Sequence, residues 1–142
     1  MAKTILVVDD DLSVLESYGR LLRRMGHRVL LSDDSESVRI DSDSLAGVDL
    51  LILDEHMPRT SGLTLLESLR NRAGAGPADG PDRPAVILIS ALLSDDLRRR
   101  AARLGVAEII EKPVDPNHLT TCVRRALEGL SLPPAAEGRR PA

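Results

Sequence analysis

The stretch LVVDDDLSV, residues 6–14, places Asp9, Asp10 and Asp11 directly after an unbroken apolar run. Neighbouring carboxylates repel one another, and crowding them raises the pKa of at least one. Such a cluster requires either a compensating cation or a solvated turn. The rest of the chain has to show which of these two surroundings the three aspartates have.

Four further apolar runs follow the first one along the chain. None of them alternates with polar residues, which is typical of strands buried on both faces of a parallel sheet. The five predicted strands are Ile5–Val8, Val29–Leu31, Leu50–Leu53, Val86–Ile89 and Ala107–Ile110.

Segments with helical spacing of apolar residues separate these runs. The clearest helix boundaries are Gly26 as a stop, Ser94 as an N-cap, and Asp115 as an N-cap before Pro116. The Ser- and Asp-rich segment from Asp34 to Leu45 predicts a short or frayed helix. The alternation of strands and helices predicts a doubly wound α/β domain with five helices.

The composition limits the classes of function. The chain has 142 residues, a net charge of −3, one tyrosine, and no Phe or Trp, so it offers no stacking platform for single-stranded nucleic acid. Its one cysteine, Cys122, excludes an internal disulfide and is predicted to lie in the core. With no predicted signal peptide or membrane span, we expect a cytoplasmic protein that does not bind nucleic acid directly.

Two segments are predicted to lie outside the core. Residues 72–84 contain three Gly and three Pro and favour an irregular surface loop. Residues 131–142 form a Pro-, Ala- and Arg-rich tail that we predict to be disordered.

Polar side chains follow four of the five predicted strands. Asp9 and Asp10 follow the first, Asp54 the third, Ser90 the fourth and Lys112 the fifth. The carboxyl ends of parallel strands share one edge, where open α/β sheets bind ligands. Paired carboxylates suit Mg²⁺, and a third carboxylate can accept a phosphoryl group as an acyl phosphate. A lysine ammonium and a hydroxyl can then bind the phosphoryl oxygens.

Four motifs carry a resemblance to a known family: LVVDDD at 6–11, LLILDEHMPRTSG at 50–62, ILISA at 87–91 and EKP at 111–113. In this order, at strand ends, they resemble the receiver domain of bacterial two-component response regulators of the chemotaxis-regulator type. The resemblance implies a flavodoxin-like fold with strand order 2-1-3-4-5 and a receiver domain over residues 1–130.

The family pattern also implies roles for residues of the acidic cluster. Asp54 is expected to be the phospho-acceptor and, with Asp10, a ligand of Mg²⁺ (or Mn²⁺). Asp9 is expected to help mainly through water, and the backbone carbonyl of His56 to be a further ligand. Asp11 is predicted to be only an N-cap.

Further roles follow at the ends of the fourth and fifth strands. Ser90 and Lys112 are expected to contact the phosphoryl oxygens, and the peptide bond before Pro113 to be cis. Family members usually carry Tyr or Phe three residues before the lysine, where this chain has Ile109. Because Ile has no ring to swing inward, we expect a weaker or rerouted switch through Ser90 and residues 91–96.

The resemblance implies a phosphorelay receiver, not an enzyme, that takes its phosphoryl group from a sensor histidine kinase or a histidine phosphotransfer protein. We expect a stand-alone receiver, monomeric or weakly dimeric, that signals to a downstream protein. The alternative is a degenerate receiver that binds proteins independently of phosphorylation.

Two other classes fit less well. A flavodoxin needs a phosphate-cradling loop where this chain has three aspartates. An aspartate-nucleophile hydrolase needs a cap or substrate domain. The arginines at 98, 99, 100 and 103 are read as a solvated helix face, with a partner-docking surface as the alternative.

Overall fold

The computed structural model describes residues 2–35, 45, 47–72 and 84–129. Within them, five parallel strands form one sheet in the order β2-β1-β3-β4-β5, as predicted. The strands are β1 (Thr4–Val8), β2 (Arg28–Ser32), β3 (Leu50–Asp54), β4 (Ala85–Ser90) and β5 (Glu108–Glu111). The helices among the described residues are α1 (Leu12–Arg24), α3 (Gly62–Arg72), α4 (Asp95–Arg103) and α5 (Pro116–Leu127).

Three predicted segments fall wholly or mainly outside the described residues. They are most of the predicted second helix (34–45), the Gly- and Pro-rich stretch within 72–84, and the tail from 131 to 142. These predictions therefore stay predictions. Within the described part of the chain, no helix is both long and apolar enough to cross a membrane.

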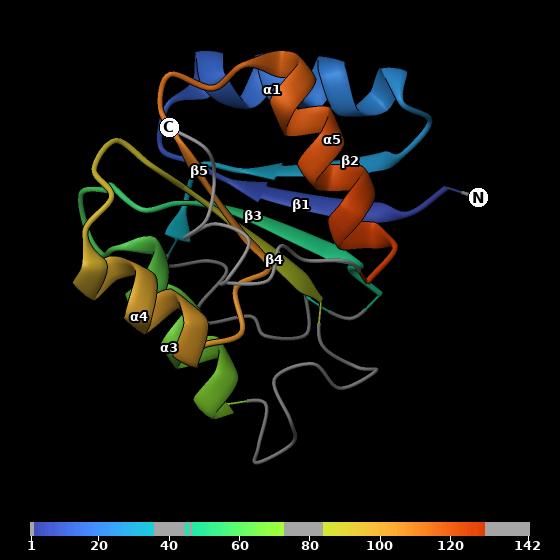
Figure 1. Ribbon diagram of the computed structural model, residues 1–142. Coiled ribbons are helices and arrows are strands. Elements are labelled where there is room, and N and C mark those ends of the chain that lie inside the picture. The colour runs from blue at the N-terminus through green and yellow to red at the C-terminus, as the bar shows by residue number, and fades with distance from the viewer. Residues whose placement is uncertain (1, 36–44, 46, 73–83, 130–142) are drawn as a thin grey trace, which may run out of the picture.

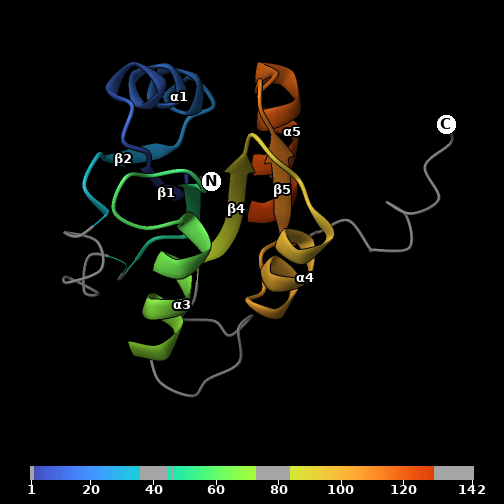
Figure 2. The same ribbon diagram turned by 90° about the vertical axis from the view of Figure 1, so that its left-hand side faces the viewer.

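The sheet separates two layers of helices. Helices α1 and α5 cover one face, and α3 and α4 cover the other (Figures 1 and 2). Alternate strand residues supply the two cores: Ile5 and Val7 pack in the cluster under α1 and α5, and Leu6 and Val8 pack in the cluster under α3 and α4. The unbroken apolar runs are thus explained, because each strand is buried on both faces.

The register of the strands aligns their carboxyl ends. Asp54 pairs with Ile89 across β3 and β4, and Ser90 pairs with Glu111 across β4 and β5. Residues directly after these positions therefore leave the sheet at the same edge. The helix that follows β1 begins with the predicted N-cap: the Asp11 side chain accepts hydrogen bonds from the Ser13 and Val14 backbone N–H groups.

Candidate functional site

Three carboxylates gather at the carboxyl edge of the sheet. Asp9 and Asp54 are buried, with 2% and 3% of their surface exposed, and Asp10 is exposed. One ligand oxygen from each lies within 4.8 Å of the others. The β1–α1 turn is fixed by two hydrogen bonds: the Asp9 N–H donates to the Ser32 carbonyl at 3.1 Å, and the Asp11 N–H donates to Asp9 Oδ1 at 2.9 Å.

Burial raises the pKa of Asp9 from 3.8 to about 6. The charges of Asp54 and Asp10 act in the same direction, while the Asp11 N–H and the Lys112 ammonium oppose the shift. Three carboxylates, two of them buried and one of these resisting ionisation, outnumber the single ammonium beside them. This donor set fits a hard divalent cation such as Mg²⁺.

Lys112 brings a cation to the site from the end of β5. Its Nζ lies 2.9 Å from Asp54 Oδ1, and its side chain is 34% exposed. The same oxygen is buried and accepts no hydrogen bond within the described ranges, so the contact is an ion pair without hydrogen-bond geometry. The Lys112–Pro113 peptide bond is cis, as predicted.

Ser90 is fully buried at the end of β4, and its hydroxyl contacts the β4–α4 loop and His56. The hydroxyl donates to the Leu92 carbonyl at 2.6 Å and accepts from the Leu92 N–H at 3.2 Å. His56 Nε2 lies 3.2 Å from the same oxygen. The structure therefore brings Ser90 to the predicted edge with its hydroxyl held by Leu92 and His56.

Two residues anchor the start of α3, and neither was predicted from the sequence: Glu55 in the β3–α3 loop and Gly62 at the first position of the helix. Glu55 is 9% exposed, and its carboxylate accepts a hydrogen bond from the Leu63 N–H at 2.9 Å, inside the first turn of α3. A Cβ on Gly62 would lie 2.6 Å from the Asp54 carbonyl oxygen. The glycine thus allows α3 to start directly against the backbone of Asp54. The one sequence feature that could have indicated this role is the position of Gly62 directly before the apolar stripe of a predicted helix.

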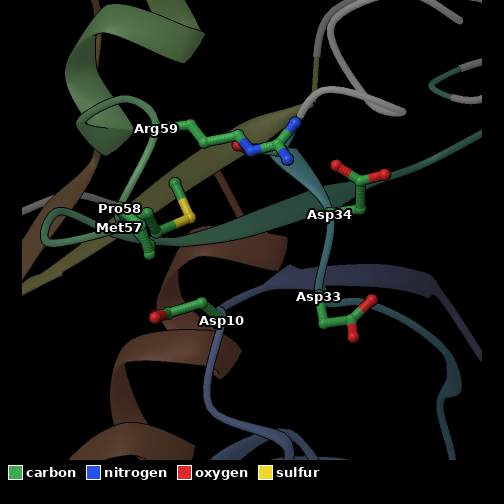
Figure 3. Close-up of a pocket in the computed structure, with 7 residues that line it drawn as sticks. Asp10, Asp33, Asp34, Met57, Pro58 and Arg59 are labelled. Carbon is green, nitrogen blue, oxygen red and sulfur yellow. The ribbon is translucent and has the colours of Figure 1, made fainter.

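A cavity of about 370 Å³ opens beside the acidic cluster. Figure 3 shows Asp10, Asp33 and Asp34 around it, with Met57, Pro58 and Arg59 from the β3–α3 loop across from them. The Arg59 side chain reaches toward Asp34 in this view. Because Asp10 belongs to both the cavity and the cluster, the cavity adjoins the cluster on the side of Asp10.

Ile109 lies in β5, where it pairs with Leu88 of β4. It is half-buried and packs against the core under α3 and α4. An aliphatic side chain held there has no ring to exchange between an exposed and a buried position. The rerouted switch predicted from this departure stays a prediction.

The comparisons with known proteins agree with this geometry. The response regulator receiver domain family matches residues 5–124. The chain therefore belongs to this family, the signalling phospho-acceptors of two-component systems.

Individual relatives show how far the likeness extends. The chemotaxis protein CheY of Treponema pallidum is 32% identical over 113 residues, which cover 78% of this chain and 73% of that protein. The DNA-binding transcriptional regulator NtrC of Azospirillum brasilense is 33% identical over 136 residues, 95% of this chain but 26% of the regulator. The chain thus spans about a quarter of the length of that longer relative.

A solved structure shares the fold. A chain in the complex of CheX, CheY, beryllofluoride and Mg²⁺ from Borrelia burgdorferi superposes with a TM-score of 0.72 at 24% identity. The match covers 85% of this chain and 86% of that chain.

The raised pKa of Asp9 predicts a pH-dependent cost to stability when no divalent cation is present. Because the folded chain binds this proton more tightly than the unfolded chain, the stability conferred by Asp9 is greatest below pH 4. It is lost as the pH rises through about 6, by up to about 3 kcal/mol. Asp9→Asn keeps an acceptor for the Asp11 N–H and removes the titration.

Urea unfolding in EDTA at pH 4 and pH 7 measures this effect. Relative to Asp9→Asn, the wild type should lose free energy of unfolding between the two pH values. Asp33→Asn, which removes an exposed carboxylate at the nearby cavity, serves as the control. Parallel pH profiles for the wild type and Asp9→Asn would contradict the assignment.

Proposed function

We propose that this chain is a phosphorylation-dependent signalling receiver in which Asp54 accepts a phosphoryl group. The observation that carries the proposal is the pairing of a buried Asp54 with Lys112, 2.9 Å apart, inside a cluster of oxygen ligands. A carboxylate held against a cation, in a cluster that adjoins a cavity at Asp10, is arranged to act as a nucleophile.

Each residue has a distinct part in the transfer. A carboxylate oxygen of Asp54 attacks the phosphorus, the bond from phosphorus to the donor breaks, and the donor leaves with the electron pair. The product is an acyl phosphate on Asp54. The Lys112 ammonium, already beside Asp54, offsets the negative charge that the phosphoryl oxygens bring.

The carboxylates of Asp10 and Asp54 and the backbone carbonyl of His56 would hold Mg²⁺ or Mn²⁺, with Asp9 acting mainly through water. When bound, the cation supplies further positive charge for the phosphoryl oxygens. The beryllofluoride and Mg²⁺ in the Borrelia burgdorferi complex support this ligand class for the shared fold.

The donor we propose is a phosphohistidine on a sensor histidine kinase or a histidine phosphotransfer protein. Phosphorylation would draw the Ser90 hydroxyl toward the phosphoryl group and rearrange residues 91–96, changing the surface offered to a downstream protein. With Ile109 at the position where the family usually has an aromatic ring, Ser90 and this loop would carry most of the switch. The receiver would comprise residues 1–130.

Titration with beryllofluoride, a phosphoryl mimic, tests the proposal by backbone amide NMR. With Mg²⁺, beryllofluoride should shift the amides of residues 90–96. Without Mg²⁺, or in Asp54→Asn, which keeps the size of the side chain and removes its charge, the shifts should be absent. A wild type that ignores beryllofluoride and Mg²⁺ would favour the alternative, a binding module independent of phosphorylation.

A further inference from the structure

We propose that His56 is a positioning residue that holds the Ser90 hydroxyl in its resting orientation and thereby weakens the affinity of the site for the phosphoryl group. The inference rests on the proposed function, since it concerns how Ser90 is released to contact that group. It starts from the 3.2 Å contact between His56 Nε2 and Ser90 Oγ.

The hydrogen bonds of Ser90 use the full capacity of its hydroxyl. A serine hydroxyl offers one donor and two acceptor sites. Its hydrogen goes to the Leu92 carbonyl, the shortest of the contacts at 2.6 Å, and one acceptor site takes the Leu92 N–H at 3.2 Å. The contact with His56 must then use the second acceptor site, so His56 Nε2 carries a hydrogen and donates it.

In this arrangement the Ser90 hydroxyl has no free hydrogen to donate to a phosphoryl group. Phosphoryl oxygens only accept hydrogen bonds, so Ser90 can bind them only by taking its hydrogen away from Leu92. Carrying Oγ itself toward Asp54 takes a rotation about the Cα–Cβ bond of Ser90, and that rotation breaks the contact between Oγ and His56. The His56 contact therefore stabilises the resting state and competes with the phosphorylated one.

Two backbone contacts hold the loop on which His56 lies. His56 forms an isolated antiparallel bridge with Ser61, and the Gly62 N–H donates to the Glu55 carbonyl at 3.1 Å. The loop is thus closed on itself just after β3, and the imidazole spans from there to the end of β4. Ser90 is buried, but His56 is exposed. We therefore expect the contact to stabilise the resting state by a free energy at the lower end of the range for a single hydrogen bond.

The test is the affinity for beryllofluoride in the presence of saturating Mg²⁺. His56→Leu removes the donor and should tighten binding by about threefold, the value of one partly exposed hydrogen bond. His56→Gln, whose amide can still donate, should lie between His56→Leu and the wild type. His118→Leu, an exposed histidine change on α5, should bind like the wild type.

A double-mutant cycle with Ser90→Ala separates positioning through Ser90 from a direct steric effect. In the Ser90→Ala background, His56→Leu should no longer alter the affinity. Ring ¹⁵N shifts of neutral His56 in the resting protein should show the hydrogen on Nε2, and this tautomer preference should weaken in Ser90→Ala.

The outcomes distinguish the two proposals. Unchanged or weaker binding in His56→Leu, an effect that persists without the Ser90 hydroxyl, or a hydrogen on Nδ1 instead of Nε2 would each overturn the role of His56. Equal binding of beryllofluoride by the wild type and Asp54→Asn would overturn the proposed function itself.

Discussion

Lys112→Gln should slow phosphorylation by acetyl phosphate and Mg²⁺ by about a hundredfold, the loss typical of removing one preorganised group that stabilises developing charge. Lys112 Nζ is 2.9 Å from Asp54 Oδ1, and the other two carboxylates of the cluster, Asp9 and Asp10, offer no positive charge. Gln keeps a hydrogen-bond donor of similar reach but removes the charge. The transferred phosphoryl group would then enter a site without its ammonium partner.

The matched control is the other lysine of the chain. Lys3 and Lys112 are the two lysines among the 19 basic residues, and the other 17 are arginines. Lys3 lies before β1, at the opposite edge of the sheet. Lys3→Gln should phosphorylate at the wild-type rate, measured by intact mass against time. Lys112→Arg should rescue only part of the rate, because a planar guanidinium does not replace a compact ammonium. Equal rates for Lys112→Gln and the wild type would rule out this role for Lys112.

Gly62→Ala should destabilise the fold by about 2 kcal/mol, although alanine is the better helix former. Helix propensity alone favours Ala over Gly by about 1 kcal/mol. Against this, the added Cβ would lie 2.6 Å from the Asp54 carbonyl oxygen and 3.0 Å from Leu88 Cδ1. The first contact is with backbone at the end of a buried strand, which cannot yield as a flexible side chain can. We therefore expect the steric term to exceed the propensity term.

Urea unfolding of Gly62→Ala and Asn71→Ala gives the comparison. Asn71 is exposed on the same helix, so its replacement by Ala changes propensity with no such backbone contact. Asn71→Ala should be neutral or slightly stabilising, whereas Gly62→Ala should be clearly destabilised and phosphorylated more slowly because Asp54 is displaced. A higher free energy of unfolding for Gly62→Ala than for the wild type would show that α3 can move away from Asp54 without destabilising the fold.

The sequence was sufficient to predict the edge at which the site lies. Runs such as Leu50–Leu53 are apolar throughout because both faces of the sheet are covered, and their direction puts Asp54 and Ser90 at a common edge. The N-caps Asp11, Ser94 and Asp115 were also predictable, since a short polar side chain before an apolar stripe satisfies the first backbone N–H groups of a helix.

Contacts between distant segments could not be predicted in this way. The burial of Glu55 against the start of α3 and the approach of Gly62 to Asp54 depend on how a loop folds back, which no local pattern encodes. The contact of the Ser90 hydroxyl with His56, 34 residues away in sequence, is another of this kind.

The arginines of α4 fit neither sequence-based reading completely. Arg98, Arg99 and Arg103 are exposed, and Arg99 pairs with Asp96 on the same helix. Arg100 instead joins α4 to α3, with a hydrogen bond of 3.0 Å to Thr64 Oγ1 and a contact of 3.7 Å with a Glu67 carboxylate oxygen. A solvated face therefore describes three of the four arginines, and a docking role for those three stays a hypothesis.

If Asp54 carries the phosphoryl group, chemical mapping of the modified residue should place the modification there. An acyl phosphate on aspartate is reduced by borohydride to homoserine, which marks the position in a peptide mass spectrum. After incubation with acetyl phosphate and Mg²⁺, reduction should convert Asp54, and no other residue, to homoserine. Homoserine at Asp9, Asp10 or Asp11, or unmodified Asp54 in a protein that has gained a phosphoryl group, would contradict the account.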